Sequence, residues 1–227
     1  MSENRMATPE EQAVLARYVG WGGIPNAFDS HKEDWAKEYR QLKGLLSESE
    51  WKAAMQSTTN AHFTSVEVIR AMYRGLESLG FTGGRVLEPS CGVGSFAGAM
   101  PSSLLPNVKS LTMVELDEVT GNIAKALYPN AKVMVQGFET AVIPDNYMDL
   151  AIGNVPFGNY AIFDKAYPKA VTSSIHNYFF AKSIDKVRPG GVLCFITSRY
   201  TMDARDSSVR EYMMQRADLL GAIRLPD

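Results

Sequence analysis

The segment 86–96 has the residue types of a ligand-binding turn. Its sequence, VLEPSCGVGSF, places Glu88 at the end of an apolar run, with Gly92 and Gly94 just before a helix that starts at about Ser95. In an open α/β sheet such a strand-to-helix turn lies at the carboxyl edge, where ligands bind, and glycine lets a ligand approach the backbone. The spacing differs from the G-x-G-x-x-G of dinucleotide-binding proteins and from a phosphate-binding P-loop. The turn therefore predicts a ligand site without naming the ligand.

A carboxylate at the end of the next apolar run narrows the kind of ligand. Glu115 follows Gly94 by twenty-one residues and closes the run at 110–115. A carboxylate in this place can accept hydrogen bonds from both hydroxyls of a ribose. The alternative is that Glu115 only caps the helix that follows. We favour the first interpretation, which predicts that the ligand contains a ribose.

The fourth apolar run ends in a tetrapeptide that resembles a known motif. Asn154-Val155-Pro156-Phe157 is similar to the Asn/Asp-Pro-Pro-Tyr/Phe motif of amino-methyltransferases that use S-adenosylmethionine. The order of the other blocks is that of the gamma-type DNA adenine-N6 methyltransferases. These blocks are Phe63-Thr64-Ser65, the glycine turn at 88–96, Glu115, His176-Asn177-Tyr178-Phe179-Phe180 and the Arg-Pro-Gly-Gly strand entry at 188–191. The opening segment 18–24, YVGWGGI, resembles the extension that this domain carries in large phage and plasmid proteins, where it is fused to a helicase-like ATPase.

The resemblance covers nearly the whole chain and implies a fold, a cofactor and a set of site residues. The fold is the Rossmann-like α/β sheet of class I methyltransferases, and the cofactor is S-adenosylmethionine. The residues that it assigns to the cofactor are Phe63, Thr64, Glu88, Pro89, Ser90, Gly92, Gly94, Phe96, Glu115, Leu116, Phe138 and Asn154. The residues that it assigns to methyl transfer are Asn154, Val155, Pro156 and Phe157. No metal is required.

The family's mechanism gives the tetrapeptide a chemical role. An exocyclic adenine amine is a poor nucleophile because its lone pair is delocalised into the ring. By that mechanism, the Asn154 side-chain oxygen and the Val155 backbone carbonyl accept the two N6 protons, which frees the lone pair to attack the methyl group. Phe157 stacks on the base once it has left the DNA helix. The expected reaction is methyl transfer to adenine N6 in DNA.

Two positions depart from the family pattern. The family usually has proline where this chain has Val155, and valine keeps the carbonyl while losing the fixed φ and adding an N–H that needs a partner. The third block reads Gln-Gly-Phe-Glu at 136–139, where the family usually has an acid before the phenylalanine. Phe138 can still pack on the cofactor adenine. Glu139 could receive the adenine amine only with a shifted loop.

The first sixty residues differ from the rest of the chain. Capping boxes at Thr8-Pro9-Glu10-Glu11, Ser47-Glu48-Ser49-Glu50 and Thr64-Ser65-Val66-Glu67 predict helix starts, and the first and third of these helices are expected to end at Gly20 and Gly80. The segment 20–25, GWGGIP, is too rich in glycine for a regular element and too apolar for a solvated loop, which predicts a packed turn around Trp21. We place a helical N-terminal extension at 1–62 and the methyltransferase domain at 63–227.

From Gly84 onward, short apolar runs alternate with helical periods, which is typical of a parallel sheet with crossover helices. Strands are expected at 85–88, 110–115, 132–135, 148–154, 192–197 and 219–225, and helices at 95–100, 118–127, 175–187 and 205–216. A methyltransferase sheet of this type normally has a seventh strand between the fifth and the sixth, and no residues remain for it. We therefore expect the last strand to be missing, an open edge beside 192–197, and a chain that is the front part of a longer polypeptide or a truncated relative of one.

Composition and charge limit the partners. With 23 basic and 25 acidic residues the formal net charge is −2, which argues against nucleic-acid binding by bulk attraction. Residues 164–216 carry nine Lys or Arg against five Asp or Glu, so this stretch is the expected DNA contact. The absence of a long apolar run and of a signal peptide predicts a cytoplasmic protein with no membrane partner. Cys91 and Cys194 are expected to be reduced thiols, and His62 and His176 to be structural rather than catalytic.

Other functions remain open at this point. Similar tetrapeptides occur in RNA and protein-glutamine methyltransferases, which would keep the cofactor and change the acceptor. A non-catalytic module that binds cofactor or nucleic acid within a larger mobile-element protein is also possible, and Val155 and the unusual third block favour it. The order of the motifs and the opening extension favour DNA. An assembly with a helicase-like ATPase is the expected partnership.

Overall fold

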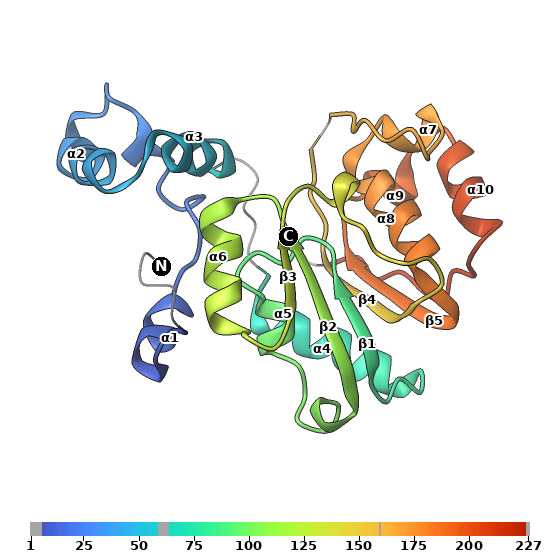
Figure 1. The fold of residues 1–227 in the computed structure, drawn as a ribbon. Coiled ribbons are helices and arrows are strands. Elements are labelled where there is room, and N and C mark those ends of the chain that lie inside the picture. The colour runs from blue at the N-terminus through green and yellow to red at the C-terminus, as the bar shows by residue number, and fades with distance from the viewer. Residues whose placement is uncertain (1–5, 59–63, 159, 226–227) are drawn as a thin grey trace.

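The computed structural model describes residues 6–58, 64–158 and 160–225, and its centre is a parallel five-stranded sheet with the order β3-β2-β1-β4-β5 (Figure 1). The strands are β1 (Gly84–Glu88), β2 (Val108–Glu115), β3 (Lys132–Val135), β4 (Met148–Asn154) and β5 (Val187–Ile196). All four pairings are parallel. The predicted α/β fold class and the first five predicted strands are confirmed.

The predicted sixth strand at 219–225 is wrong. These residues have no regular secondary structure, and Ile223 is 90% exposed. A strand needs a neighbour for its backbone N–H and C=O groups, and an apolar run without one does not form a ladder. In the described part of the chain β5 is the end strand of the sheet, so the open edge expected beside 192–197 is present.

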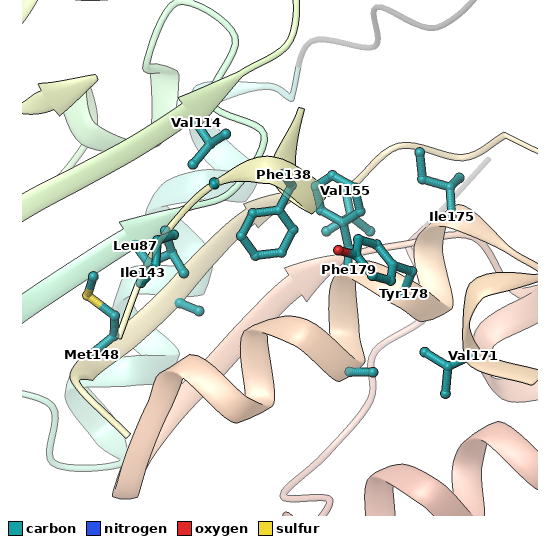
Figure 2. Packing of buried hydrophobic residues seen from close by; sticks show 13 residues of the cluster. Leu87, Val114, Phe138, Ile143, Met148, Val155, Val171, Ile175, Tyr178 and Phe179 are labelled. Atoms are coloured by element: carbon teal, nitrogen blue, oxygen red, sulfur yellow. The ribbon is translucent and has the colours of Figure 1, made fainter. Parts of the chain in front are cut away.

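Different helices cover the two faces of the sheet. Val86 of β1 and Leu150 of β4 pack in one cluster with α4 (Val66–Ser78) and α5 (Ser95–Gly98). Their neighbours Leu87 and Ala151 belong to the cluster on the opposite face, which also contains Tyr178 of α8 (Ile175–Lys186). Figure 2 shows Leu87 and Tyr178 within this cluster. The alternation follows from the period of two in a strand. Both faces of the central strands are therefore buried, which explains their continuous apolar sequences.

Hydroxyl caps start several helices. The capping boxes of Thr8 with Glu11 and of Ser47 with Glu50 are confirmed, and they open α1 (Pro9–Leu15) and α3 (Glu48–Ser57). The third box is wrong by one residue, because Ser65 rather than Thr64 caps α4, accepting from the backbone N–H of Val68 at 3.4 Å. Two adjacent hydroxyl residues can both serve as a cap, and the sequence does not distinguish them. The first helix is also shorter than predicted, since it ends at Leu15 instead of continuing to Gly20.

The remaining helices complete the two layers. The helix expected at 118–127 is α6 (Glu118–Leu127), the one at 175–187 is α8, and the one at 205–216 is the shorter α10 (Ser208–Met214). The sequence did not predict α2 (Ala36–Leu45), α7 (Lys169–Thr172) and α9 (Tyr200–Asp203). Among the described residues, no helix combines the length and the apolar character that a membrane crossing requires.

The N-terminal extension has its own small core and contacts α6. Trp21 meets Phe28 edge to face at 5.4 Å between ring centroids, and Phe28 packs on Trp51, so the predicted packed turn around Trp21 is confirmed. The Gln12 side-chain amide donates to the carbonyl of Ala126 at 2.9 Å, which joins α1 to α6 (Figure 1). The proposed boundary between residues 62 and 63 lies outside the described residues.

Candidate active site

The sheet order brings the predicted blocks to one edge. Glu88, Glu115 and Asn154 are the last residues of β1, β2 and β4, and these three strands are neighbours in the order β2-β1-β4. Because all strands run parallel, their carboxyl ends lie at the same edge of the sheet, where α/β proteins bind ligands. The structure therefore places the glycine turn, the carboxylate and the tetrapeptide side by side.

The two turn glycines have different reasons to be glycine. Both have positive φ, 56° at Gly92 and 86° at Gly94, which other residues rarely adopt. A Cβ on Gly94 would lie 2.4 Å from the ring of Tyr128, whose hydroxyl donates to the Gly94 carbonyl at 2.7 Å. A Cβ on Gly92 would meet no atom within 4 Å. Gly94 thus serves the packing of α6 against the turn, and Gly92 faces open space that a ligand can occupy.

Glu115 holds the turn in place. One carboxylate oxygen accepts from the backbone N–H of Gly92 at 2.8 Å, and the other accepts from the N–H of Asp117 at 2.9 Å. Burial raises the pKa of Glu115, and these two N–H groups partly offset the rise. The residue that caps α6 is Asp117, which accepts from the N–H of Thr120 at 2.7 Å. The alternative interpretation of Glu115 as the helix cap is therefore wrong.

Glu88 is a buried acid without a partner. Its side chain is 1% exposed, and neither of its oxygens has a hydrogen-bond partner within the described residues. Burial raises its pKa well above the usual range, the nearby amides of Ala97 and Phe96 lower it in part, and the charge of Glu115 raises it further. A buried acid of this kind can receive a cation or a hydroxyl donor from a ligand.

The other residues assigned to the cofactor lie around this turn. Thr64 precedes α4, and its hydroxyl is buried without a partner in the described structure. Pro89 is buried and Ser90 is half-buried, both directly after β1. Phe96 packs in the cluster on the α4 face. Phe63, also assigned to the cofactor, lies outside the described residues.

Leu116, which was assigned to the cofactor, and Phe138, which was expected beside the adenine, differ in access. Leu116 follows Glu115 and is 74% exposed. Phe138 is only 2% exposed, and its ring lies 5.0 Å from that of Phe179, within the core cluster of Figure 2. Leu116 is therefore available to a ligand, whereas the ring of Phe138 is covered by α8.

The tetrapeptide continues the ladder between β4 and β5. Asn154 pairs with Ile196, and the N–H of Val155 donates to the carbonyl of Ile196 at 3.1 Å. The N–H that valine adds relative to proline therefore has a partner. Val155 is buried, Pro156 is half-buried, and Phe157 is 38% exposed. The motif thus has a fixed base in the sheet and an aromatic ring that reaches solvent.

A polar network that the sequence analysis missed supports the loop after this motif. Asp164 accepts from the hydroxyl of Tyr178 at 2.6 Å and lies 3.5 Å from the ammonium of Lys182. Lys182 also donates to the carbonyl of Glu139 at 3.0 Å, and its ammonium lies 5.2 Å from the ring centroid of Phe138. Helix α8 therefore ties the loop that follows β3 to the loop that follows β4. The sequence signal that could have indicated this network is Lys182 itself, a lysine on the buried face of a predicted helix.

The described histidine and cysteine side chains near these blocks are buried or half-buried. His176 contacts the hydroxyl of Ser174, and burial lowers its pKa. Cys91 is buried within the glycine turn, and its burial raises the pKa of its thiol. Cys194 is half-buried in β5 and is also a free thiol. His62 lies outside the described residues.

The basic stretch 164–216 is partly neutralised. Four of its side chains form ion pairs with carboxylates, and these are Lys182, Lys186, Arg188 and Arg216. Arg188 and Arg85 both pair with Asp149, which lies at the opposite end of β4 from Asn154. Although burial opposes it, the N–H of Arg85 and the guanidinium of Arg188 lower the pKa of Asp149 to about 2. The remaining basic side chains of the stretch are the candidates for contact with phosphates.

Comparisons with known proteins agree with this arrangement. The model of the Eco57I restriction-modification methylase family matches residues 109–225, just over half of the chain. The protein "Defense against restriction protein B" of Escherichia phage P1 is 28% identical over 225 residues, a match that takes in 96% of this chain and 8% of that protein. The chain therefore spans less than a tenth of the length of this curated relative.

Solved structures show the same fold. The methyltransferase subunit of a type I restriction-modification system from Streptococcus thermophilus superposes with a TM-score of 0.58 at 14% identity, over 81% of this chain and 48% of that one. A protein from Listeria monocytogenes described as a class I S-adenosylmethionine-dependent methyltransferase gives a TM-score of 0.54 at 14% identity, over 90% of this chain and 71% of that one. The Rossmann-like class I methyltransferase fold expected from the sequence is confirmed.

The family match includes the later blocks of the resemblance, whereas the glycine turn at 88–96 precedes it. The matched segment contains the strand that ends in Glu115, the tetrapeptide at 154–157 and helix α8. By this match, the chain belongs to the Eco57I restriction-modification methylase family.

Proposed function

We propose that this chain transfers a methyl group from S-adenosylmethionine to the exocyclic N6 amine of adenine in DNA. S-adenosylmethionine is the expected cofactor of the family and the fold. The observation that supports the proposal most strongly is the meeting of Glu115, Gly92 and Asn154 at one edge of the sheet. The first two form a ribose site, and the third begins the tetrapeptide that contacts the acceptor amine.

The residues present fit the cofactor. Gly92 leaves open space in front of the turn, and Glu115 has lone pairs left after its two backbone contacts. Glu88 and Thr64 contribute buried polar atoms that have no partner in the described structure. Leu116 offers an exposed apolar surface to the adenine. When bound, S-adenosylmethionine supplies an electrophilic methyl group on a sulfonium.

The tetrapeptide prepares the acceptor. The Asn154 side-chain oxygen and the Val155 carbonyl would accept hydrogen bonds from the two N6 hydrogens, so that the nitrogen lone pair is directed away from the adenine ring. The hydrogen bond from the Val155 N–H to Ile196 fixes the peptide to the sheet, and this bond compensates for the missing proline. Phe157, which reaches solvent, stacks on the flipped base.

The wider role follows from the relatives. The phage P1 relative is named for defense against restriction, and its length supports a place for this chain in a larger assembly. We propose that DNA contacts the unpaired basic side chains of 164–216, that a helicase-like ATPase is the partner, and that the protein acts in the cytoplasm. Two parts are proposed in the chain itself, an extension at 1–62 and a methyltransferase domain at 63–227.

A methyl-transfer assay tests the proposal. The full chain is incubated with radiolabelled S-adenosylmethionine and with unmethylated DNA, RNA or a glutamine peptide, and the labelled product is identified by mass spectrometry. The expected product is N6-methyladenine in DNA. Label found only in RNA or only in the peptide would show that this molecule, and not DNA, is the acceptor. Cofactor binding without transfer to any acceptor would favour a non-catalytic module.

A further inference from the structure

Buried polar atoms without partners occur where the N-terminal extension meets the methyltransferase domain. They are the hydroxyl of Tyr18, the indole N–H of Trp21 and the second carboxylate oxygen of Asp117, and none has a hydrogen-bond partner within the described residues. Folded proteins pair nearly all buried polar groups, because an unpaired one costs about 1–3 kcal/mol. Three such groups at one junction indicate a missing partner.

The local sequence explains how these groups come together. Helix α1 is joined to α6 by the hydrogen bond from Gln12 to Ala126. After α1, Gly20 has a φ of 72°, a conformation that turns the chain so that Trp21 lies edge to face on Tyr18 with 5.7 Å between ring centroids. The glycine-rich motif of the extension therefore places an aromatic pair directly after the helix that contacts α6.

This aromatic pair lies close to the proposed ribose site. Asp117, the cap of α6, is two residues beyond Glu115, and its N–H donates to Glu115. Burial raises the pKa of Tyr18 to about 12, the nearby Thr120 hydroxyl lowers it in part, and the charges of Asp117 and Glu115 raise it further. The influence of both carboxylates on this pKa agrees with the contact between α1 and α6. No hydrogen bond of normal geometry joins the Tyr18 hydroxyl to Thr120 or Trp21.

The chemistry of the three groups suits a nucleoside. A hydroxyl and an indole N–H supply donors, and a carboxylate oxygen supplies an acceptor. Adenosine has ribose hydroxyls that donate and accept, and ring nitrogens that accept. A second acid beside Glu115 and two additional donors would extend the recognition that Glu115 begins, since each oxygen of Glu115 already accepts one backbone N–H.

We propose that Tyr18 and Trp21 belong to the cofactor site, where they cover its nucleoside end and hydrogen-bond to the adenosine moiety, an inference that rests on the function proposed above. The extension then has a direct role in the site. The rings of Tyr18 and Trp21 meet edge to face, and Trp21 packs in the small N-terminal core. The hydroxyl of Tyr18 and the indole N–H of Trp21 face the ligand. Asp117 connects the two parts, because it both caps α6 and borders the nucleoside.

Calorimetric titration of the full chain with S-adenosylhomocysteine tests this proposal. Tyr18→Phe removes one hydroxyl and keeps the ring, and it should weaken binding about tenfold. Trp21→Phe should weaken it by a similar factor. Tyr39→Phe and Trp35→Phe make the same chemical changes within the core of the extension, away from α6, and should leave the affinity unchanged.

Adenosine and unfolding measurements separate ligand binding from structural support. The loss in Tyr18→Phe should be the same for adenosine as for S-adenosylhomocysteine, because the contact is to the nucleoside. The melting temperature of ligand-free Tyr18→Phe should match that of the parent, since the hydroxyl makes no hydrogen bond there. A variant that melts earlier and binds as tightly as the parent would assign Tyr18 a structural role and overturn the proposal.

Tryptophan fluorescence provides a second readout. The chain has 3 tryptophans, at positions 21, 35 and 51. Cofactor binding should change the emission of the parent and of Trp35→Phe, and Trp21→Phe should lose most of that change. If Tyr18→Phe and Trp21→Phe both bind the ligand as tightly as the parent and show the parent's emission change, this inference is overturned. The proposed function stays intact in that case if Glu115→Ala loses binding. A parent chain that binds neither ligand would overturn both.

Discussion

The two halves of the sheet's carboxyl edge differ in how their polar groups are satisfied. Around β1 and β2, the side chains of Glu88, Asp117 and Tyr18 have buried polar atoms that lack partners within the described residues. Around β4 and α8, Asp164 accepts from Tyr178 and pairs with Lys182. The first half has several unpaired atoms that the proposed ligand would meet. In the second half the loop is held by Asp164, Tyr178 and Lys182, and the Ser183 hydroxyl lacks a partner among the described residues.

This difference assigns separate tasks to the two halves. A site that keeps unpaired donors and acceptors gains free energy when a matching ligand fills it, and it gives up stability without one. A loop held by a buried ion pair keeps its shape whether or not the acceptor is present. The tetrapeptide lies at the border, since its backbone continues the ladder to β5 while Asn154 ends β4 next to the cofactor half. The predictions below test this separation.

Removal of the Asn154 amide should have the largest effect. Asn154→Ala deletes the proposed acceptor of the reacting amine, and loss of such a group costs about 10²–10³-fold in turnover. Cofactor affinity should stay within about twofold of the parent, because Glu115 and the glycine turn are unchanged. Single-turnover transfer and calorimetric titration measure the two effects. An equal loss of turnover and of cofactor affinity would show that the two halves of the edge do not act separately.

Breaking the network on α8 should reduce stability. Lys182→Met leaves Asp164 and the Glu139 carbonyl without their buried partner, which should lower the free energy of unfolding by about 3 kcal/mol. Lys186→Met is the matched control, because its partner Asp145 is largely exposed and such a pair contributes less than about 1 kcal/mol. Urea unfolding of both variants gives the comparison. Equal losses would mean that burial of the Lys182 pair does not determine its contribution.

Glu115→Ala tests the cofactor half. The substitution removes the proposed ribose acceptor and the carboxylate that holds the N–H groups of Gly92 and Asp117. The affinity for S-adenosylmethionine should fall by about thirtyfold, which corresponds to about 2 kcal/mol. Calorimetry measures the loss. Unchanged affinity would remove Glu115 from the site.

The smallest effect is expected at Val155. Val155→Pro restores the residue of the family motif but deletes the N–H that donates to Ile196, which should cost about 1 kcal/mol of stability. Turnover should not rise, because the ladder already fixes the carbonyl. Parallel measurements of unfolding and turnover decide the point. A clear gain in turnover would show that the fixed φ of proline matters more than the hydrogen bond.

The sequence predicted the elements whose signal is local. Strands β1 and β4 are short runs buried on both faces, and the caps at Thr8 and Ser47 depend on residues three positions apart. The strand expected at 219–225 failed because pairing requires a neighbour that no local pattern reveals. The start of β5 at Val187 was missed since Pro189 and two glycines interrupt its apolar run.

In the candidate site, too, the sequence predicted only what a local pattern indicates. The position of Glu115 could be predicted from its distance to the glycine turn. The contact of Lys182 with Asp164 and with the loop at Glu139 joins three distant parts of the chain, so no spacing indicated it. The approach of Tyr18 to the start of α6 depends in the same way on how the extension docks.

Hydrogen exchange of the full chain, with and without S-adenosylhomocysteine, tests the separation of the two halves most directly. The account predicts slower exchange at 15–24, 88–96 and 115–120 when the ligand is bound, because these segments gain partners. Exchange in α8, at 175–186, should be unchanged, since Tyr178 and Lys182 already bind Asp164 without a ligand. Protection confined to α8 and the tetrapeptide, or no protection at the cofactor segments, would contradict the account.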